Sequence, residues 1–145
     1  MRKTERFPVK GANSLWHVYD TVPFWKVIKN FIFIQAARYS PFLSWKNFFY
    51  RTFLRMEVGK ETSFALMVMV DVMFPERIKV GNNTIIGYNT TILAHEYLID
   101  EYRIGDVIIG DRVLIGANST ILPGVTIGND AIISAATLAN ADVPE

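Results

Sequence analysis

The sequence predicts a mainly β protein: a parallel β-helix of six-residue repeats, preceded by a helical appendage. Glycine follows an aliphatic residue at six-residue intervals, with one interruption, at Val80, Ile86, Ile109, Ile115 and Ile127. Residues 1–55 hold ten Lys or Arg against two acids and all three tryptophans, whereas residues 56–145 hold five against twelve. We therefore divide the 145 residues into an N-terminal appendage, 1–55, and a β-helix, 56–145.

The period of six separates a β-helix from an ordinary strand, in which side chains alternate with a period of two. Strands that are cut and turned every six residues build a triangular coil of about 18 residues. Each aliphatic residue then points inward, and we expect Gly, Asn or Asp to supply the unusual backbone angles at the bends. A β-sandwich also alternates apolar and polar residues, but it does not keep an unbroken six-residue spacing from Ile109 to Ala139.

The repeat is irregular at two places. The stretch Val58–Val80 is looser, and Pro75 within it suits a corner or a bulge. Farther on, Ile109 arrives one residue early after a run of positions six apart, at Ile86, Ile92, Leu98 and Ile104. His95 stands beside this second irregularity. We expect Glu96–Arg103 to bulge or to form a loop over His95.

The appendage is predicted to contain two helices. The first spans residues 21–38 and places on one side Phe24, Val27, Ile28 and Phe31. The second follows Ser40-Pro41 and places on one side Phe42, Trp45, Phe49 and Phe53. Two interpretations remain open. The helices cover the first coil, with their aromatics against it and their positive charge toward its acids. Alternatively, residues 21–55 make peripheral contact with an anionic membrane.

Several classes of protein are excluded or disfavoured by composition. The chain has no cysteine, which rules out disulfides, thiolate zinc sites and cysteine nucleophiles. It has no uninterrupted apolar run of about 18 residues and no signal-peptide core, so we expect a cytoplasmic protein. The acidic repeat region argues against nucleic-acid binding.

The C-terminal segment resembles a known family. The stretch VIIGDRVLIGANSTILPGVTIGNDAIISAATLANADVP is similar to the last coils of bacterial hexapeptide-repeat acyltransferases, which include maltose, galactoside and serine O-acetyltransferases. The resemblance covers roughly residues 56 to 144. It implies a left-handed β-helix and a homotrimer with active sites between neighbouring subunits. It also implies an O-acetyltransferase that uses acetyl-CoA, requires no metal, and acts on a small hydroxylated acceptor, with a sugar or a cell-envelope saccharide as the expected acceptor.

The resemblance assigns roles to particular residues. His95 takes the position of the family's general base, which removes the proton of the acceptor hydroxyl, and an imidazole titrates near neutral pH as this role requires. Asp71, Asn89 and Glu96 are candidates for substrate binding. The predicted acetyl-CoA contacts are Leu114, Gly116, Ala117, Ala135 and Ala136. The sequence departs from the family's pattern at Leu114, where tryptophan is common, and at Asn140-Ala141, where a Thr followed by Lys or Arg is common.

The same fold also supports two other functions. Carbonic anhydrases with this fold bind zinc through three histidines, whereas the repeats here contain only His95. A β-helix without catalytic activity, acting as a scaffold or binding protein, is the alternative that the sequence leaves open.

Overall fold

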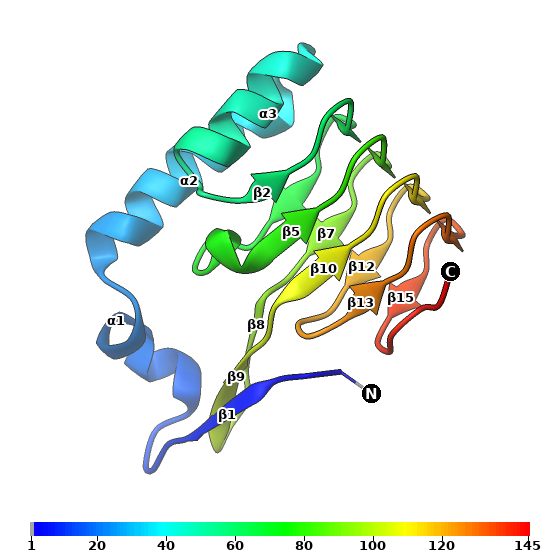
Figure 1. Cartoon of the computed structure of the whole chain (residues 1–145). Coiled ribbons are helices and arrows are strands. Elements are labelled where there is room, and N and C mark those ends of the chain that lie inside the picture. The colour runs from blue at the N-terminus through cyan, green and yellow to red at the C-terminus, as the bar shows by residue number, and fades with distance from the viewer. Residues whose placement is uncertain (1) are drawn as a thin grey trace.

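The computed structural model describes residues 2–145 and confirms a parallel β-helix, with helices across one end (Figure 1). Four coils stack, and each contributes one strand to each of three four-stranded parallel faces. The first face contains β2 (Glu57–Val58), β5 (Ile78–Val80), β10 (Val107–Ile109) and β13 (Thr126–Ile127). The second face contains β3 (Ser63–Phe64), β6 (Ile85–Ile86), β11 (Leu114–Ile115) and β14 (Ile132–Ile133). The third face contains β4 (Met69–Val70), β7 (Thr91–Ile92), β12 (Thr120–Ile121) and β15 (Leu138–Ala139).

The core is a set of aliphatic ladders, as the six-residue spacing predicts. On the second face, paired strands stack in register and bury Phe64, Ile86, Ile115 and Ile133. Each side chain fills the prism directly above the one in the previous coil. Burying a side chain of this size contributes about 1.5–3 kcal/mol, so the ladders account for much of the stability.

The bends differ from the prediction in one respect. Left-handed backbone angles do occur at Asn83, Asn89, Asn118 and Asp130, but also at Glu61, Met67, Arg112 and Ala136. The glycines that follow the aliphatic residues do not adopt these angles. They are needed because neighbouring coils stack too closely for a side chain. A Cβ on Gly116 would lie 2.4 Å from the backbone nitrogen of Ala135 in the next coil. Glycine is therefore required there because neighbouring coils approach each other closely.

Both irregular stretches lie at the corner between the third and first faces, which we name the insertion corner. In the first coil it contains residues 71–77, with a 3-10 turn, η2 (Pro75–Arg77), where Pro75 was expected to mark a corner or bulge. In the second coil it contains residues 94–106, which form a hairpin of β8 (His95–Tyr97) and β9 (Glu101–Ile104). Glu96–Arg103 therefore leaves the repeat as expected, but it does so as an antiparallel pair that satisfies its own backbone and not as a loop over His95. Leu98 and Ile104 belong to the hairpin and not to the repeat.

The appendage begins with a strand that the sequence did not predict. β1 (Glu5–Pro8) pairs antiparallel with β9 and completes a sheet in the order β1-β9-β8. It is followed by η1 (Ser14–His17), α1 (Val18–Thr21), α2 (Phe24–Tyr39) and α3 (Leu43–Thr52). The last two are the expected helices, and they lie across the first coil (Figure 1). The division into an appendage, 1–55, and a β-helix, 56–145, stays a prediction. One strand of the appendage, β1, pairs with a strand of the second part, β9.

The buried side of α2 and α3 is not the aromatic side that the sequence analysis expected. The residues buried against the coil are Asn30, Ile34, Ala37, Lys46, Asn47 and Tyr50. Most residues of the predicted apolar sides are exposed, notably Phe24, Ile28, Phe31, Phe42 and Trp45. Phe33, Phe49 and Phe53 pack against one another, with the Phe33 and Phe53 rings stacked at 3.9 Å, and Phe33 and Phe49 also pack against the buried core.

The reason is that the first coil has no preceding coil to bind its outward carbonyl groups. Asn47 Nδ2 donates to the Thr62 carbonyl at 2.7 Å, and Lys46 Nζ donates to those of Phe64 and Ala65, each at 3.0 Å. Buried backbone acceptors need donors, and an open sheet edge exposes a whole row of them. The helices therefore close the β-helix with polar side chains. We call α2 and α3 the helical cap.

Candidate active site

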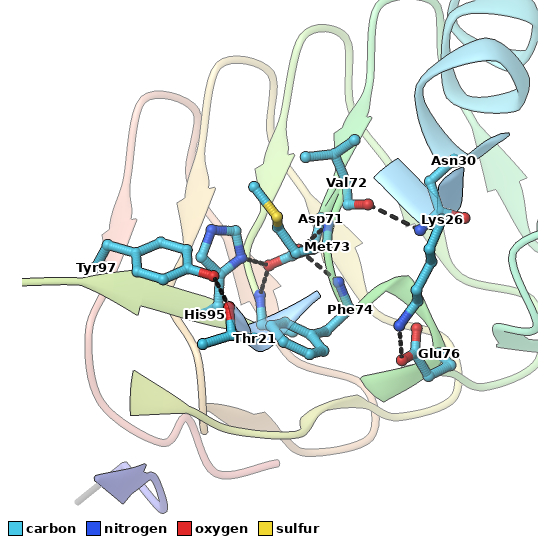
Figure 2. A network of polar contacts seen from close by, with 11 residues as sticks. Thr21, Lys26, Asn30, Asp71, Val72, Met73, Phe74, Glu76, His95 and Tyr97 are labelled. Carbon is cyan, nitrogen blue, oxygen red and sulfur yellow. Dashed lines mark hydrogen bonds and ion pairs between the residues drawn. The ribbon is translucent and has the colours of Figure 1, made fainter. Parts of the chain in front are cut away.

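A buried aspartate holds His95 in place at the insertion corner (Figure 2). Asp71 Oδ2 lies 2.5 Å from His95 Nδ1 and accepts the Ala94 backbone N–H at 2.6 Å. Its other oxygen, Oδ1, accepts the backbone N–H groups of Met73 and Phe74 at 2.8 and 2.9 Å. Asp71 is only 1% exposed, and these four donors compensate its burial.

Stacking of successive coils brings these two residues together. Val70 and Ile92 are paired in the third face, and the chain enters the insertion corner just after each of them. Asp71 is the first residue of the upper insertion, and His95 opens the hairpin of the lower one. Residues 24 positions apart thus meet because both follow a third-face strand at the same corner of neighbouring coils.

The geometry fixes which ring nitrogen of His95 is available. A carboxylate only accepts hydrogen bonds, so Nδ1 carries the hydrogen that faces Asp71. Nε2 is then the nitrogen that can take a proton from a reactant. The ring is edged by Phe74 and Tyr97, with centroids at 6.0 and 5.1 Å, and 16% of the side chain stays exposed. The site therefore presents an oriented imidazole with one open edge.

The residues predicted to bind substrate lie in three different environments. Asp71 already accepts four hydrogen bonds, which favours a positioning role, and the substrate-binding role that the resemblance implied stays a prediction. Glu96 projects to the opposite side of the hairpin from His95, because strand side chains alternate. There it forms an ion pair with Arg2. Asn89 lies at another corner, where its Nδ2 donates to Asn118 Oδ1 at 2.9 Å and its φ is 56°.

The predicted acetyl-CoA residues gather away from His95. Gly116 and Ala117 lie at the corner between the second and third faces, and Ala135 and Ala136 occupy the same corner one coil later. We name it the small-residue corner, and Asn89 also belongs to it. In one chain the whole third face separates this corner from the insertion corner. The structure therefore does not bring the predicted contacts and His95 together within one subunit.

An apolar stripe runs along the outside of the second face. Ile85, Leu114 and Ile132 are in register and point outward, with 51%, 41% and 73% of each exposed. Leu114, a predicted acetyl-CoA contact, is part of this stripe. An aligned row of exposed aliphatic side chains is typical of a surface that contacts another protein chain.

The comparisons with known proteins agree with this architecture. The family described as "Hexapeptide repeat of succinyl-transferase" matches residues 106–137. YvoF of Bacillus subtilis, provisionally named an acetyltransferase, is 74% identical over 145 residues, which are all of this chain and 84% of that protein. A Staphylococcus aureus protein with a similar provisional name, SAR0816, is 46% identical over 145 residues and 90% of its own length. The chain belongs to the hexapeptide-repeat acetyltransferase family.

Solved structures of hexapeptide-repeat acetyltransferases share the fold. A Vibrio cholerae member solved with acetyl-CoA matches 83% of this chain and 79% of its own, with a TM-score of 0.67 and 20% identity. A galactoside acetyltransferase in complex with coenzyme A matches 83% and 73%, with a TM-score of 0.59 and 18% identity. A Clostridium difficile maltose O-acetyltransferase matches 83% and 80%, with a TM-score of 0.57 and 19% identity. These similarities establish the predicted left-handed parallel β-helix.

The site of this hexapeptide-repeat acetyltransferase includes two residues that sequence reasoning missed. The Tyr97 hydroxyl donates to Thr21 Oγ1 at 2.9 Å, because Thr21 itself donates to the Val18 carbonyl at 2.7 Å. Burial raises the pKa of Tyr97, so its hydroxyl stays protonated at neutral pH. Tyr97 lies two positions after His95 in the same strand, so its side chain is on the same side of the hairpin. The sequence would have indicated it only if the hairpin had been predicted. Nothing in the sequence indicated Thr21.

Proposed function

We propose that this chain is an acetyl-CoA-dependent O-acetyltransferase that acts on a hydroxyl of a sugar or a cell-envelope saccharide. The observation that carries the proposal is the buried Asp71 carboxylate holding His95 by Nδ1, with Nε2 left for a reactant. The proposal also draws on the maltose and galactoside enzymes among the structural neighbours. A cytoplasmic location, expected from the sequence, suits a protein that uses this donor.

His95 performs the proton transfer in this mechanism. Its Nε2 accepts the proton of the acceptor hydroxyl, whose oxygen thereby becomes a stronger nucleophile. Asp71 keeps the hydrogen on Nδ1 and stabilises the imidazolium that forms, which makes it a positioning residue. Acetyl-CoA, when bound, supplies an acetyl group activated as a thioester.

The small-residue corner suits the donor. Ala135 and Ala136 are exposed and carry only a methyl group, so the backbone beneath them is accessible. Gly116 and Ala117 continue the same strip in the preceding coil. We assign the acetyl-CoA contacts to this strip, and we assign Asn89, at its other end, to the acceptor or the donor.

A complete site then requires two chains. The insertion corner of one subunit and the small-residue corner of its neighbour meet if the apolar stripe of Ile85, Leu114 and Ile132 is an interface. A three-sided prism with one such stripe per chain fits a closed homotrimer. Three equivalent sites would then lie between adjacent subunits.

The test is acceptor-dependent release of coenzyme A thiol, measured over a panel of sugars and small alcohols. His95→Ala should lower kcat about 10²–10⁴-fold, the usual contribution of a positioned general base. Asp71→Asn should also lower kcat, while the KM for acetyl-CoA stays unchanged. His17→Ala is the matched control, because His17 is the other histidine and lies outside the site.

Three outcomes would contradict the proposal. The first is full turnover in His95→Ala, which would make His95 a packing residue. The second is a wild-type chain that neither binds acetyl-CoA nor releases thiol with any acceptor, which would favour the scaffold alternative. The third is a monomer in sedimentation at micromolar concentration with full activity, which would exclude a shared site.

A further inference from the structure

The outer side of the helical cap is apolar over its whole length. On α2 the exposed residues recur at three- and four-residue spacing and comprise Phe24, Trp25, Ile28, Phe31, Ile32 and Tyr39. Beside them, at the start of α3, the exposed residues are Phe42, Leu43, Trp45 and Phe48. We call these ten residues the aromatic face. Trp25 and Trp45 are 66% and 61% exposed, so the face is open in this chain.

The fold does not need this face. The inner side already docks the helices, through Ile34, Ala37 and Tyr50 and through the hydrogen bonds of Asn30 and Asn47. Ten large apolar side chains on the outer surface favour contact with another surface, because covering them removes apolar area from water. Exposed patches of this kind mark interaction sites.

The charge around the face identifies what covers it. No acidic residue occurs between Asp20 and Glu57, and this stretch holds six Lys or Arg. Lys26 is paired with Glu76, and Lys46 is buried inside the cap. Among residues 2–145, Lys29 and Arg55 have no ion-pair partner; both lie with Trp25 along one edge of the face. Glu76 is the acid in the pocket that holds these residues, and it is already paired with Lys26. The face is therefore aromatic with a net cationic edge, a combination suited to an anionic surface with an apolar interior.

We propose that the aromatic face binds an anionic phospholipid bilayer, with the helical cap lying in the plane of the membrane surface. None of the described helices is long and apolar enough to cross a bilayer. α2 has 16 residues and is about 24 Å long. This is shorter than the hydrocarbon core of about 30 Å, so the helix lies along the surface. Trp and Tyr rings suit the headgroup boundary, and Lys29 and Arg55 reach the lipid phosphates.

A second copy of the chain fits this face less well. Two such faces in contact would bring Lys29 and Arg55 of both copies together, without an acid in the whole stretch to offset them. Like charges placed across an interface oppose association. The aliphatic stripe on the second face of the β-helix is a separate surface at the side of the coils. Contact between copies and contact with lipid therefore use different parts of the molecule.

Membrane binding would also bring the candidate site to the bilayer. α2 is bonded to the insertion corner by Asn30, which donates to the Val72 carbonyl at 2.8 Å, and by the Lys26–Glu76 pair (Figure 2). Val72 directly follows Asp71. The Asp71–His95 pair would thus be held at a fixed distance from the lipid surface.

The experiment is flotation of the full chain with vesicles of phosphatidylglycerol and phosphatidylcholine, alongside vesicles of phosphatidylcholine alone. The wild type should float with the anionic vesicles, and its tryptophan emission should shift to the blue, because all three tryptophans are exposed. Trp25→Ser combined with Trp45→Ser should weaken binding about tenfold or more, from the apolar area lost. Lys29→Gln combined with Arg55→Gln should weaken it at low salt.

Ile99→Ser is the matched control, since Ile99 is 71% exposed but lies at the tip of the hairpin. It should float like the wild type. Circular dichroism melting should confirm that every variant is folded. The proposal is overturned if the wild type stays unbound to anionic vesicles, or if the tryptophan variant floats as well as Ile99→Ser. It is also overturned if the tryptophan substitutions lower the oligomeric state in sedimentation, because a second copy would then cover the face.

Discussion

The β-helix and the helical cap place their side chains in opposite ways. In the coils, aliphatic residues point inward and the bends face water. In the cap, Asn30, Lys46 and Asn47 point inward, while Trp25 and Trp45 point outward. The difference follows from what each region packs against. A middle coil meets a neighbour whose backbone groups match its own, whereas the cap meets a coil with unpaired carbonyls.

This contrast shows that an amphipathic pattern does not tell which side of a helix is buried. The usual rule buries the apolar side, because burial of apolar area drives folding. Here the side that docks carries the donors that the carbonyls of the first coil need, and each carbonyl left buried without a donor would cost about 1–3 kcal/mol. The side that faces the protein is therefore mixed, with Asn30, Lys46 and Asn47 beside buried apolar residues, and most of the aromatic side is left for another surface.

The largest change in the free energy of unfolding is expected when an inward side chain of the coils is truncated and compared with an outward side chain of the cap. Ile115→Ala removes a fully buried side chain from a ladder and should lower the free energy of unfolding by about 2–5 kcal/mol. Trp25→Ser removes a larger but exposed side chain and should change it by less than about 0.5 kcal/mol. Urea unfolding measures both. A loss in Trp25→Ser similar to that in Ile115→Ala would show that the aromatic face packs on protein.

A smaller effect is expected at the polar contact between cap and coil. Asn47→Ala leaves the Thr62 carbonyl without its donor and should lower the free energy of unfolding by about 1–3 kcal/mol. Ser44→Ala, at an exposed position on the same helix, is the control and should be nearly neutral. If the two variants unfold at the same urea concentration, the donors of the cap do not close the first coil.

The sequence was sufficient for the parts of the molecule that repeat. Positions such as Ile86 and Ile115 have equivalent neighbours in every coil, so one spacing rule predicts them all. It was insufficient where the chain leaves the repeat. The hairpin pairs with β1, more than 90 residues away, and Leu98 coincides with the six-residue spacing only by accident.

The site was predicted in part for the same reason. His95 was found because it stands beside an interruption of the repeat. The contact with Asp71 depends on two insertions at one corner, which becomes visible only when the coils are stacked. Glu96 was named because it is adjacent in sequence, yet alternation along the strand turns it to the other side. Whether His95 and the small-residue corner act together stays a prediction that the trimer would test.

The smallest expected effect is a pH dependence of the sheet β1-β9-β8, where ion pairs connect the appendage to the β-helix. Arg6 and Arg103 donate to Glu101 and lower the pKa of its carboxyl from 4.5 to about 2. A carboxyl with a lowered pKa stabilises the fold above its unfolded pKa, and the contribution is lost as pH falls through the folded value. Attachment of β1 to β9 should therefore weaken as pH falls from 4.5 toward about 2.

The amide shifts of β1, followed by NMR over this pH range, measure that attachment, and added salt should reduce the dependence because Arg6 is exposed. Glu101→Gln removes the titrating group while keeping a side chain of the same shape, so the dependence should become flatter. The backbone pairing between Phe7 and Tyr102 and the stacking of their rings at 4.8 Å do not titrate and should hold β1 in place in part. If Glu101→Gln shows the same pH dependence as the wild type, another acid controls the attachment, and the neighbouring Arg2–Glu96 pair is the next to test.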